Sequence, residues 1–258
     1  MVNVIKNLLS HPLTRNVDID DPRCTELRRR ILKEKRFLFR LYLEWYRELE
    51  TMLPPAGKPV VELGAGGSFM KEVIPDVITT EVFYIKNADV IADGTSLCFC
   101  DNSLCGIVMT FVLHHIPSPE LFFSEACRCL KKGGKIVMLE PWVTPWSKVI
   151  YRKLHHEPYS DQERGWEFMT SGPLSGANIA LPWIIFQRDR HIFESKFPML
   201  AVKKIMPVSP LCYLLSGGIS YRSLLPGFMF PAIWKLEQTM QSCNKYIAMF
   251  AFIELEMN

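Results

Sequence analysis

The chain of 258 residues is long enough for one large domain with a substantial hydrophobic core. Its hydrophobic content of 48%, charged content of 22% and net charge of +3 exclude general disorder, and they lack the strong positive bias of nucleic-acid binders. No uninterrupted apolar run reaches the roughly 18 residues of a membrane span, and the first residues are too polar for a signal peptide. We therefore expect a soluble, cytoplasmic protein with small-molecule partners and no nucleic-acid partner, while contact with a membrane surface and the oligomeric state stay open.

An amphipathic pattern covers the first part of the chain. Apolar residues recur at helical spacing from Cys24 to Glu50, among many arginines, lysines and glutamates, which predicts one long helix. Its basic cluster, from Arg28 to Arg36, could bind an anion, but we interpret it as a solvated face. Prolines and a glycine between positions 54 and 59 end this helix. Residues 1–57 are thus predicted to form a helical segment that packs on or caps the following core.

Short apolar runs alternate with helical stretches from residue 58 to residue 140. The predicted strands are 60–63, 77–82, 88–92, 106–110 and 135–140, and the predicted helices between them are 68–74 and 118–130. This alternation indicates an α/β fold with a parallel sheet and helices on both faces. In such sheets ligands bind beyond the carboxyl ends of the strands. Glu62, Glu81 and Asp93 fall at or near those ends.

A glycine-rich turn follows the first strand, in the run Val60-Val61-Glu62-Leu63-Gly64-Ala65-Gly66-Gly67. Its glycines let the backbone bend tightly and approach a ligand without a Cβ atom between them. Several classes of nucleotide-binding protein share such a turn. The dinucleotide pattern G-x-G-x-x-G would place a third glycine at position 69, where this chain has Phe69. That difference counts against an NAD(P)- or flavin-dependent oxidoreductase, which we keep as the alternative enzyme.

The alternating pattern breaks between residues 141 and 198. This stretch is rich in proline, glycine and aromatic residues, holds four of the six tryptophans, and is too long for a plain connection. We interpret it as an inserted lid or substrate subdomain after the fifth strand. A strand at 200–206, a helical region at 231–241 and a final strand at 246–255 then complete a domain that spans residues 58–258.

The order of the motifs resembles that of the class I S-adenosylmethionine-dependent methyltransferases, specifically the small-molecule group that includes the quinone methyltransferases. The matching motifs are the glycine turn, the acid Glu81, Asp93-Gly94, His114-His115-Ile116-Pro117 and the strand after Gly133-Gly134. The resemblance covers residues 58–140 and the final strand. It implies a Rossmann-like sheet of seven strands, mostly parallel, with an antiparallel last strand.

The same resemblance implies S-adenosyl-L-methionine as the cofactor and methyl transfer to an oxygen, nitrogen or carbon atom of a small organic acceptor. This acceptor would be a lipid-like, aromatic or sugar metabolite. Glu62 would orient the methionine end of the cofactor, Glu81 would accept hydrogen bonds from both ribose hydroxyls, and Asp93 would receive the adenine amino group. The other implied cofactor contacts are Gly64, Ala65, Gly66, Gly67, Gly94, Thr110 and Phe111.

Four histidines are the candidate catalytic residues. Methyl transfer from a sulfonium depends largely on holding the reacting atoms close and aligned, so a general base is needed only if the acceptor must lose a proton. His114 and His115 follow the fourth strand, and His155 and His156 precede a glutamate in the predicted lid. A histidine titrates near neutral pH and a carboxylate can orient it, but a packing role for each of the four stays open. Because no base is unmistakable, a non-catalytic cofactor-binding protein is the third alternative.

Other polar features are weaker candidates. The loop from Ser171 to Asn178, with Arg188 and Arg190 nearby, could bind acceptor hydroxyls or a phosphate, and the tryptophans of the predicted lid could form an apolar wall. We expect no metal site, because the eight cysteines lack the paired C-x-x-C spacing of zinc sites.

Overall fold

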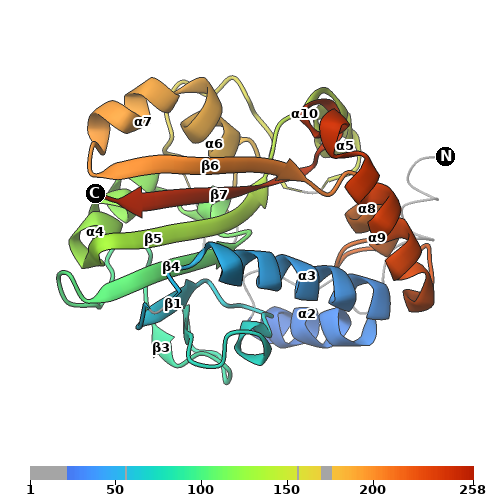
Figure 1. Ribbon diagram of the computed structural model, residues 1–258, viewed down its shortest axis with the longest axis horizontal. Coiled ribbons are helices and arrows are strands. Elements are labelled where there is room, and N and C mark those ends of the chain that lie inside the picture. The colour runs from blue at the N-terminus through green and yellow to red at the C-terminus, as the bar shows by residue number, and fades with distance from the viewer. Residues whose placement is uncertain (1–21, 56, 156, 170–175) are drawn as a thin grey trace.

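Seven strands form one mixed sheet in the computed structural model, which describes residues 22–55, 57–155, 157–169 and 176–258. Their order is β3-β2-β1-β4-β5-β7-β6, with β6 and β7 at one edge and β3 at the other (Figure 1). The strands are β1 (Val60–Leu63), β2 (Ile78–Glu81), β3 (Val90–Ile91), β4 (Leu104–Thr110), β5 (Leu130–Pro141), β6 (Leu200–Val208) and β7 (Phe250–Met257). The first five pair in parallel, whereas β7 is antiparallel to both β5 and β6. The predicted Rossmann-like sheet with an antiparallel last strand is confirmed.

Helices cover both faces of this sheet. The α-helices are α2 (Pro22–Glu34), α3 (Arg36–Met52), α4 (Pro119–Cys129), α5 (Pro145–Lys153), α6 (Leu181–Trp183), α7 (Arg190–Lys196), α8 (Cys212–Ser216), α9 (Phe230–Thr239) and α10 (Asn244–Ile247). Short 3₁₀ turns are η2 (Met70–Glu72), η3 (Leu113–His115), η5 (Gly227–Met229) and η6 (Gln241–Cys243), and η4 (Ile184–Arg188) is a π-helical segment. None of the helices within the described ranges is long and apolar enough to cross a membrane.

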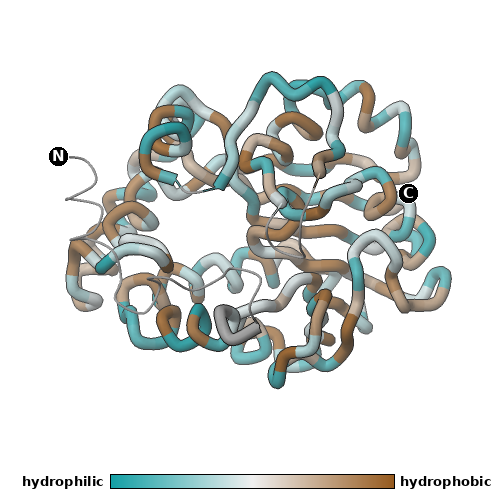
Figure 2. Tube along the Cα trace, turned by 180° about the vertical axis from the view of Figure 1, so that it is seen from behind, coloured by the Kyte–Doolittle hydropathy of each residue, from teal (hydrophilic) through white to brown (hydrophobic). Residues whose placement is uncertain are grey.

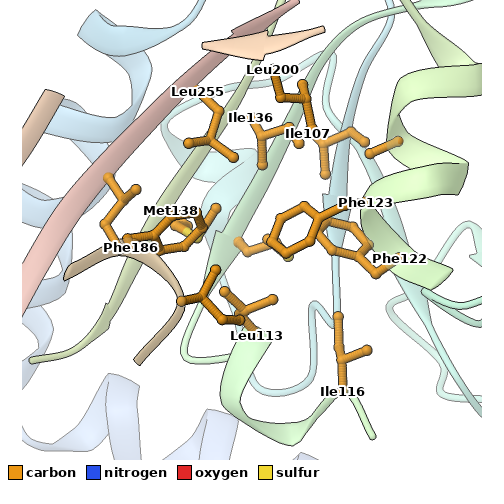
Figure 3. Packing of buried hydrophobic residues seen from close by; sticks show 14 of the residues in the cluster. Ile107, Leu113, Ile116, Phe122, Phe123, Ile136, Met138, Phe186, Leu200 and Leu255 are labelled. Carbon is orange, nitrogen blue, oxygen red and sulfur yellow. The ribbon is translucent and has the colours of Figure 1, made fainter. Parts of the chain in front are cut away.

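Alternate residues of the central strands supply two separate hydrophobic cores. On one face, Ile107 and Ile136 pack in a cluster with the rings of Phe122, Phe123 and Phe186 (Figure 3). On the other face, the neighbouring strand residues, among them Val108 and Val137, belong to the cluster that contains the buried side of α3. Both faces are therefore buried, which is why these strands read as continuous apolar runs. Figure 2 shows the strands in the middle of the molecule mostly in the hydrophobic colour.

The predicted long N-terminal helix is wrong in one respect, because it is interrupted at Lys35. This residue has φ −82° and ψ 84°, outside the helical region, and it separates α2 from α3. Its side chain is buried, and its ammonium group donates hydrogen bonds to the backbone oxygens of Gly218 and Tyr221. The break thus lets one lysine of the basic cluster turn inward, whereas Arg30 and Lys33 are exposed as predicted.

Several predicted element boundaries are also corrected. The helix expected at 68–74 is reduced to the single 3₁₀ turn η2. Strand β5 begins directly after α4, at Leu130, which pairs with Leu104 before a bulge leads to the pair of Lys135 with Gly106. The final strand begins at Phe250 rather than at Tyr246, because Tyr246 and Ile247 belong to α10 and residues 248–249 connect this helix to the strand.

The segment between β5 and β6 has two parts. From Leu181 onward it packs on the sheet, since Ile184, Phe186 and Phe193 are fully buried in the cluster that contains Phe123. Before Leu181 the segment continues from the carboxyl end of β5. There α5 begins with a capping box and contacts α10. A second long connection, with α8 to α10, leads from β6 to β7 and contacts α3. The division into an N-terminal segment, a core and a lid at 141–198 stays a prediction.

Candidate active site

A cavity of about 310 Å³ lies at the carboxyl ends of the parallel strands. All ten residues predicted to contact a cofactor line it: Glu62, Gly64, Ala65, Gly66, Gly67, Glu81, Asp93, Gly94, Thr110 and Phe111. Three of the four candidate histidines, His114, His115 and His155, line it as well. His156 and residues 171–175 of the candidate polar loop lie outside the described residues.

The glycine turn brings backbone against neighbouring side chains. Gly64 has φ +64°, and a Cβ atom at this position would meet a methyl group of Val112 at 2.8 Å. Gly66 also has a positive φ, of +47°, and its backbone N–H points to Glu81. These two positions require glycine, the first for its conformation and for space, the second for its conformation.

Glu62 is a buried carboxylate with an unsatisfied oxygen. The residue is 2% exposed, and its Oε2 has no hydrogen-bond partner. Burial raises the pKa of the Glu62 carboxyl to about 8, although a hydrogen bond with Ser68 acts in the opposite direction. A buried oxygen without a partner costs free energy, so this atom fits a cationic donor that enters the cavity.

Glu81 is held by two backbone amides. Its Oε2 accepts from the N–H of Gly66 and its Oε1 from the N–H of Val82, both at 2.8 Å. Burial raises the pKa of the Glu81 carboxyl, while these two hydrogen bonds lower it. Each oxygen retains a second lone pair, so a carboxylate fixed in this way can accept hydrogen bonds from two adjacent hydroxyls.

The remaining predicted residues differ in how firmly they are held. Asp93 is exposed, and its Oδ1 accepts hydrogen bonds from the backbone and hydroxyl of Thr95, which shapes the turn after β3. At the end of β4, the buried hydroxyl of Thr110 has no partner. Phe111 has φ +60°, which is strained for a residue with a side chain. Its ring packs against Trp45 and Phe250 and stabilises this turn.

His114 lies between two carboxylates. Its Nδ1 is 2.7 Å from Oε2 of Glu140, and its Nε2 is 3.6 Å from Oε2 of Glu157. Burial alone would lower the pKa of His114, but the two glutamates outweigh it and raise the pKa to about 9. His114 therefore carries a proton near neutral pH, which makes it a poor general base.

His115 stacks beside His114, with ring centroids 4.3 Å apart. Its Nδ1 is 3.0 Å from the backbone oxygen of Gly176, and its Nε2 is 3.8 Å from Oε1 of Glu157. Burial and the charge on His114 lower the pKa of His115 to about 4. The pKa of Glu157 is also lowered, because His114 and the other histidines outweigh the effect of burial. Nδ1 of His155 is 3.8 Å from Oε2 of Glu157.

Glu140 is the residue that the sequence prediction missed. It is fully buried at the end of β5, and its Oε1 accepts 2.7 Å hydrogen bonds from the backbone N–H groups of Val112 and Leu113. It thereby fixes the start of η3 and orients His114. An acid at the carboxyl end of a strand that neighbours a His-His motif was the signal that could have found it.

Other candidates lie away from the cavity. Arg188 pairs with Asp189 and Arg190 with Glu194, and neither arginine lines the cavity. The four tryptophans of the segment 141–198 do not line the cavity either. Trp142 and Trp166 lie in a hydrophobic core cluster and Trp183 packs against it, which favours core packing over an apolar wall for the acceptor. Aromatic residues that do line the cavity include Tyr151, Tyr213 and Phe250.

The geometry after β1 argues against a dinucleotide. A bound pyrophosphate usually rests on the N-terminus of a helix that follows the glycine turn. Here that position holds only the 3₁₀ turn η2. Phe69 is 1% exposed and stacks on Phe39, so its ring packs in the hydrophobic core. No further glycine is needed there, and the turn is shaped for a ligand without a pyrophosphate.

The comparison with protein families supports one of the nucleotide-binding classes. Residues 74–138 match a family model described as a methyltransferase domain. Over this stretch the chain is similar to that methyltransferase domain. The match indicates an S-adenosylmethionine-dependent methyltransferase. No curated protein matches the chain.

Solved structures with a similar chain path include three methyltransferases. One is an S-adenosylmethionine-dependent methyltransferase from Mesorhizobium loti, 14% identical in sequence with a TM-score of 0.45. The alignment covers 81% of this chain and 96% of the Mesorhizobium loti chain. A second, from Listeria monocytogenes, is 10% identical with a TM-score of 0.46, covering 83% and 97%. A geranyl diphosphate C-methyltransferase from Streptomyces coelicolor is 14% identical with a TM-score of 0.48, covering 97% and 90%.

Proposed function

We propose that this methyltransferase acts in the cytoplasm on a small organic acceptor and methylates one of its oxygen, nitrogen or carbon atoms. The observation that carries the proposal is the unsatisfied Oε2 of Glu62, which is buried beside the glycine turn and lines the same cavity as Glu81. The amino group of the cofactor's methionine part would supply the missing partner. A charge-assisted hydrogen bond of this kind is roughly twice as strong as a neutral one.

Glu81 is proposed to bind the ribose. Gly66 and Val82 hold its carboxylate in one orientation before any ligand arrives, so little conformational entropy is lost on binding. The backbone around Gly64, Ala65 and Gly67 would pack against the cofactor. Asp93 and Gly94 would lie at its adenine end, where the exposed carboxylate of Asp93 retains one oxygen outside its own turn.

Thr110 and Phe111 are proposed to separate the cofactor from the acceptor. Beyond them lie His114, His115 and Glu157, with Tyr151 and Tyr213 among the aromatic lining residues. S-adenosylmethionine supplies an electrophilic methyl group on a sulfonium. The side chains at this end would hold the acceptor atom close to that methyl group and in line with it, which can account for much of the rate.

The histidines would act mainly by position. His114, with a pKa of about 9, holds the loop after β4 through Glu140. His115 is uncharged near neutral pH and lines the cavity, so we propose that it contacts the polar group of the acceptor. His155 and His156 stay candidates for the same contact. The combination of aromatic and polar groups supports an acceptor that has an apolar body and one polar reacting group.

Calorimetric titration with S-adenosylhomocysteine tests the cofactor site. Glu81→Gln removes the negative charge at constant shape, and we expect it to weaken binding about tenfold or more. Glu194→Gln is the matched control, because this exposed acid pairs with Arg190 on α7 and should leave binding unchanged. Absence of binding to the wild-type protein would refute the proposed site.

Transfer of a labelled methyl group to fractionated cell extract tests the reaction and isolates the acceptor. We expect one labelled small molecule, absent when S-adenosylhomocysteine is added in excess. Tight cofactor binding with no labelled product from any fraction would instead support the non-catalytic alternative.

A further inference from the structure

Three side chains with metal-binding atoms converge at the acceptor end of the cavity. His114 and His115 belong to η3, and Glu157 follows α5 in a different connection. One nitrogen of each histidine and one carboxylate oxygen lie within 4.8 Å of one another. We propose that the protein binds one divalent transition-metal ion here, with Zn²⁺ the best match, through Nε2 of His114, Nε2 of His115 and the carboxylate of Glu157.

The orientation of both imidazole rings supports this proposal. The backbone oxygen of Gly176 can only accept a hydrogen bond, so the Nδ1 of His115 must donate to it. Glu140 holds the Nδ1 of His114 in the same way. Once a metal ion displaces the Nε2 proton of His114, each ring directs the lone pair of its Nε2 toward Glu157. Histidines that bind metals almost always donate their other N–H to a carboxylate or a backbone carbonyl, and both kinds of acceptor are present.

The distances fit an ion better than direct hydrogen bonds. Nε2 of His114 is 3.6 Å and Nε2 of His115 is 3.8 Å from the carboxylate oxygens of Glu157, beyond ordinary hydrogen-bond length. Zinc bonds of about 2.0 to 2.1 Å in tetrahedral geometry place neighbouring ligand atoms about 3.3 Å apart. The two distances end on different oxygens of Glu157, and one ligand atom from each residue lies within 4.8 Å of the others, so an ion would draw the three side chains together by up to about 1.5 Å. The set of two imidazoles and one carboxylate is also one that zinc accepts.

Three protein ligands leave at least one coordination position open, and all three residues line the cavity. An oxygen of the acceptor bound at that position would lose its proton more readily, because a Lewis acid lowers the pKa of a bound hydroxyl. The proton would pass to solvent, and a carbon–oxygen bond would form as the bond between methyl carbon and sulfur breaks. This last step rests on the proposed function and narrows the acceptor to one with an oxygen donor.

The decisive experiment is calorimetric titration of the chelator-treated, untagged protein with ZnCl₂. We expect one ion per chain, with His115→Gln and Glu157→Gln each weakening binding by about 10- to 100-fold. His191→Gln is the matched control, since this exposed histidine lies on α7 and does not line the cavity. Circular dichroism checks that every variant folds.

Cobalt substitution identifies the ligand atoms. Nitrogen and oxygen ligands should give only the ligand-field bands of Co²⁺, whereas a thiolate charge-transfer band would assign the metal to the cysteines. Failure to bind one ion, binding that survives in both variants, or a thiolate band would overturn the proposal. A proton shared by His114 and Glu157 would then explain the cluster.

Titration with S-adenosylhomocysteine on the same samples separates this inference from the proposed function. Cofactor binding without metal binding refutes the metal site alone. Metal binding without cofactor binding refutes the proposed methyl-donor site and leaves the metal site standing.

Discussion

The two ends of the cavity are built by different means. The end proposed for the cofactor takes most of its proposed contacts from residues 62–94, and it relies on glycines, backbone N–H groups and carboxylates at the ends of β1 and β2. The acceptor end gathers side chains from η3, from the connection after β5 and from the one after β6. Its polar groups, His114, His115 and Glu157, contact one another across these connections.

This difference separates what the fold provides from what the particular chain provides. Parallel strands place their carboxyl ends at one edge, so a cofactor site there follows from the topology. The acceptor site depends on long connections whose course the sheet does not determine. Changes at the two ends should therefore have different consequences, and four substitutions can separate them.

Glu140→Gln should have the largest effect, at the acceptor end. Glu140 accepts from Val112, Leu113 and His114, and a glutamine offers only one oxygen to these three donors. His114 would also lose its buried counter-charge. We expect the free energy of unfolding to fall by about 3 kcal/mol, measured by urea denaturation. Glu194→Gln, at an exposed ion pair, should change it by less than about 0.5 kcal/mol. A loss as small as the control's would show that Glu140 does not organise this end.

Gly64→Ala should be the most damaging change at the cofactor end. Alanine at φ +64° is strained, and its Cβ atom would lie 2.8 Å from a methyl group of Val112. Gly133→Ala is a matched control for the strain alone, because Gly133 has φ +75° and nothing within 4 Å of an added Cβ atom. We expect losses of about 2 to 3 kcal/mol at Gly64 and about 1 kcal/mol at Gly133. Equal losses of stability in Gly64→Ala and Gly133→Ala would mean that the Val112 side chain moves aside without destabilising the fold.

The same contrast explains what could be predicted from the sequence. Glu62, Gly64 and Glu81 belong to short-range patterns in which a strand, a turn and an acid follow one another, so their place in the cavity was predictable. Glu140 and Glu157 acquire their partners only when distant segments meet, so a place at a strand end or after a histidine pair does not by itself show what each carboxylate contacts. The break at Lys35 was missed for a related reason, since its partners Gly218 and Tyr221 lie in another connection.

The pH dependence of cofactor binding tests Glu62. Burial raises the pKa of its carboxyl from 4.5 to about 8 in the folded protein, so this residue stabilises the fold less as pH rises from 4.5 through 8. A cationic ligand group needs the ionised carboxylate. We expect the affinity for S-adenosylhomocysteine to rise between about pH 6 and pH 8, by up to tenfold per pH unit. Glu62→Gln should bind more weakly and lose this dependence. An equal dependence in the variant would assign it to another group.

Lys35→Met should have the smallest effect of the four, at the junction of the two ends. Methionine retains the apolar stem of the lysine but leaves the carbonyls of Gly218 and Tyr221 without their donor. We expect a loss of about 1 kcal/mol in the free energy of unfolding. Lys33→Met is the control, because Lys33 makes an exposed ion pair with Glu72. The loop held by Lys35 contributes Ile219 and Ser220 to the cavity, so hydrogen exchange in this loop should speed up in Lys35→Met alone. Unchanged exchange would mean that the contacts of α8 with α3 hold the loop without the lysine.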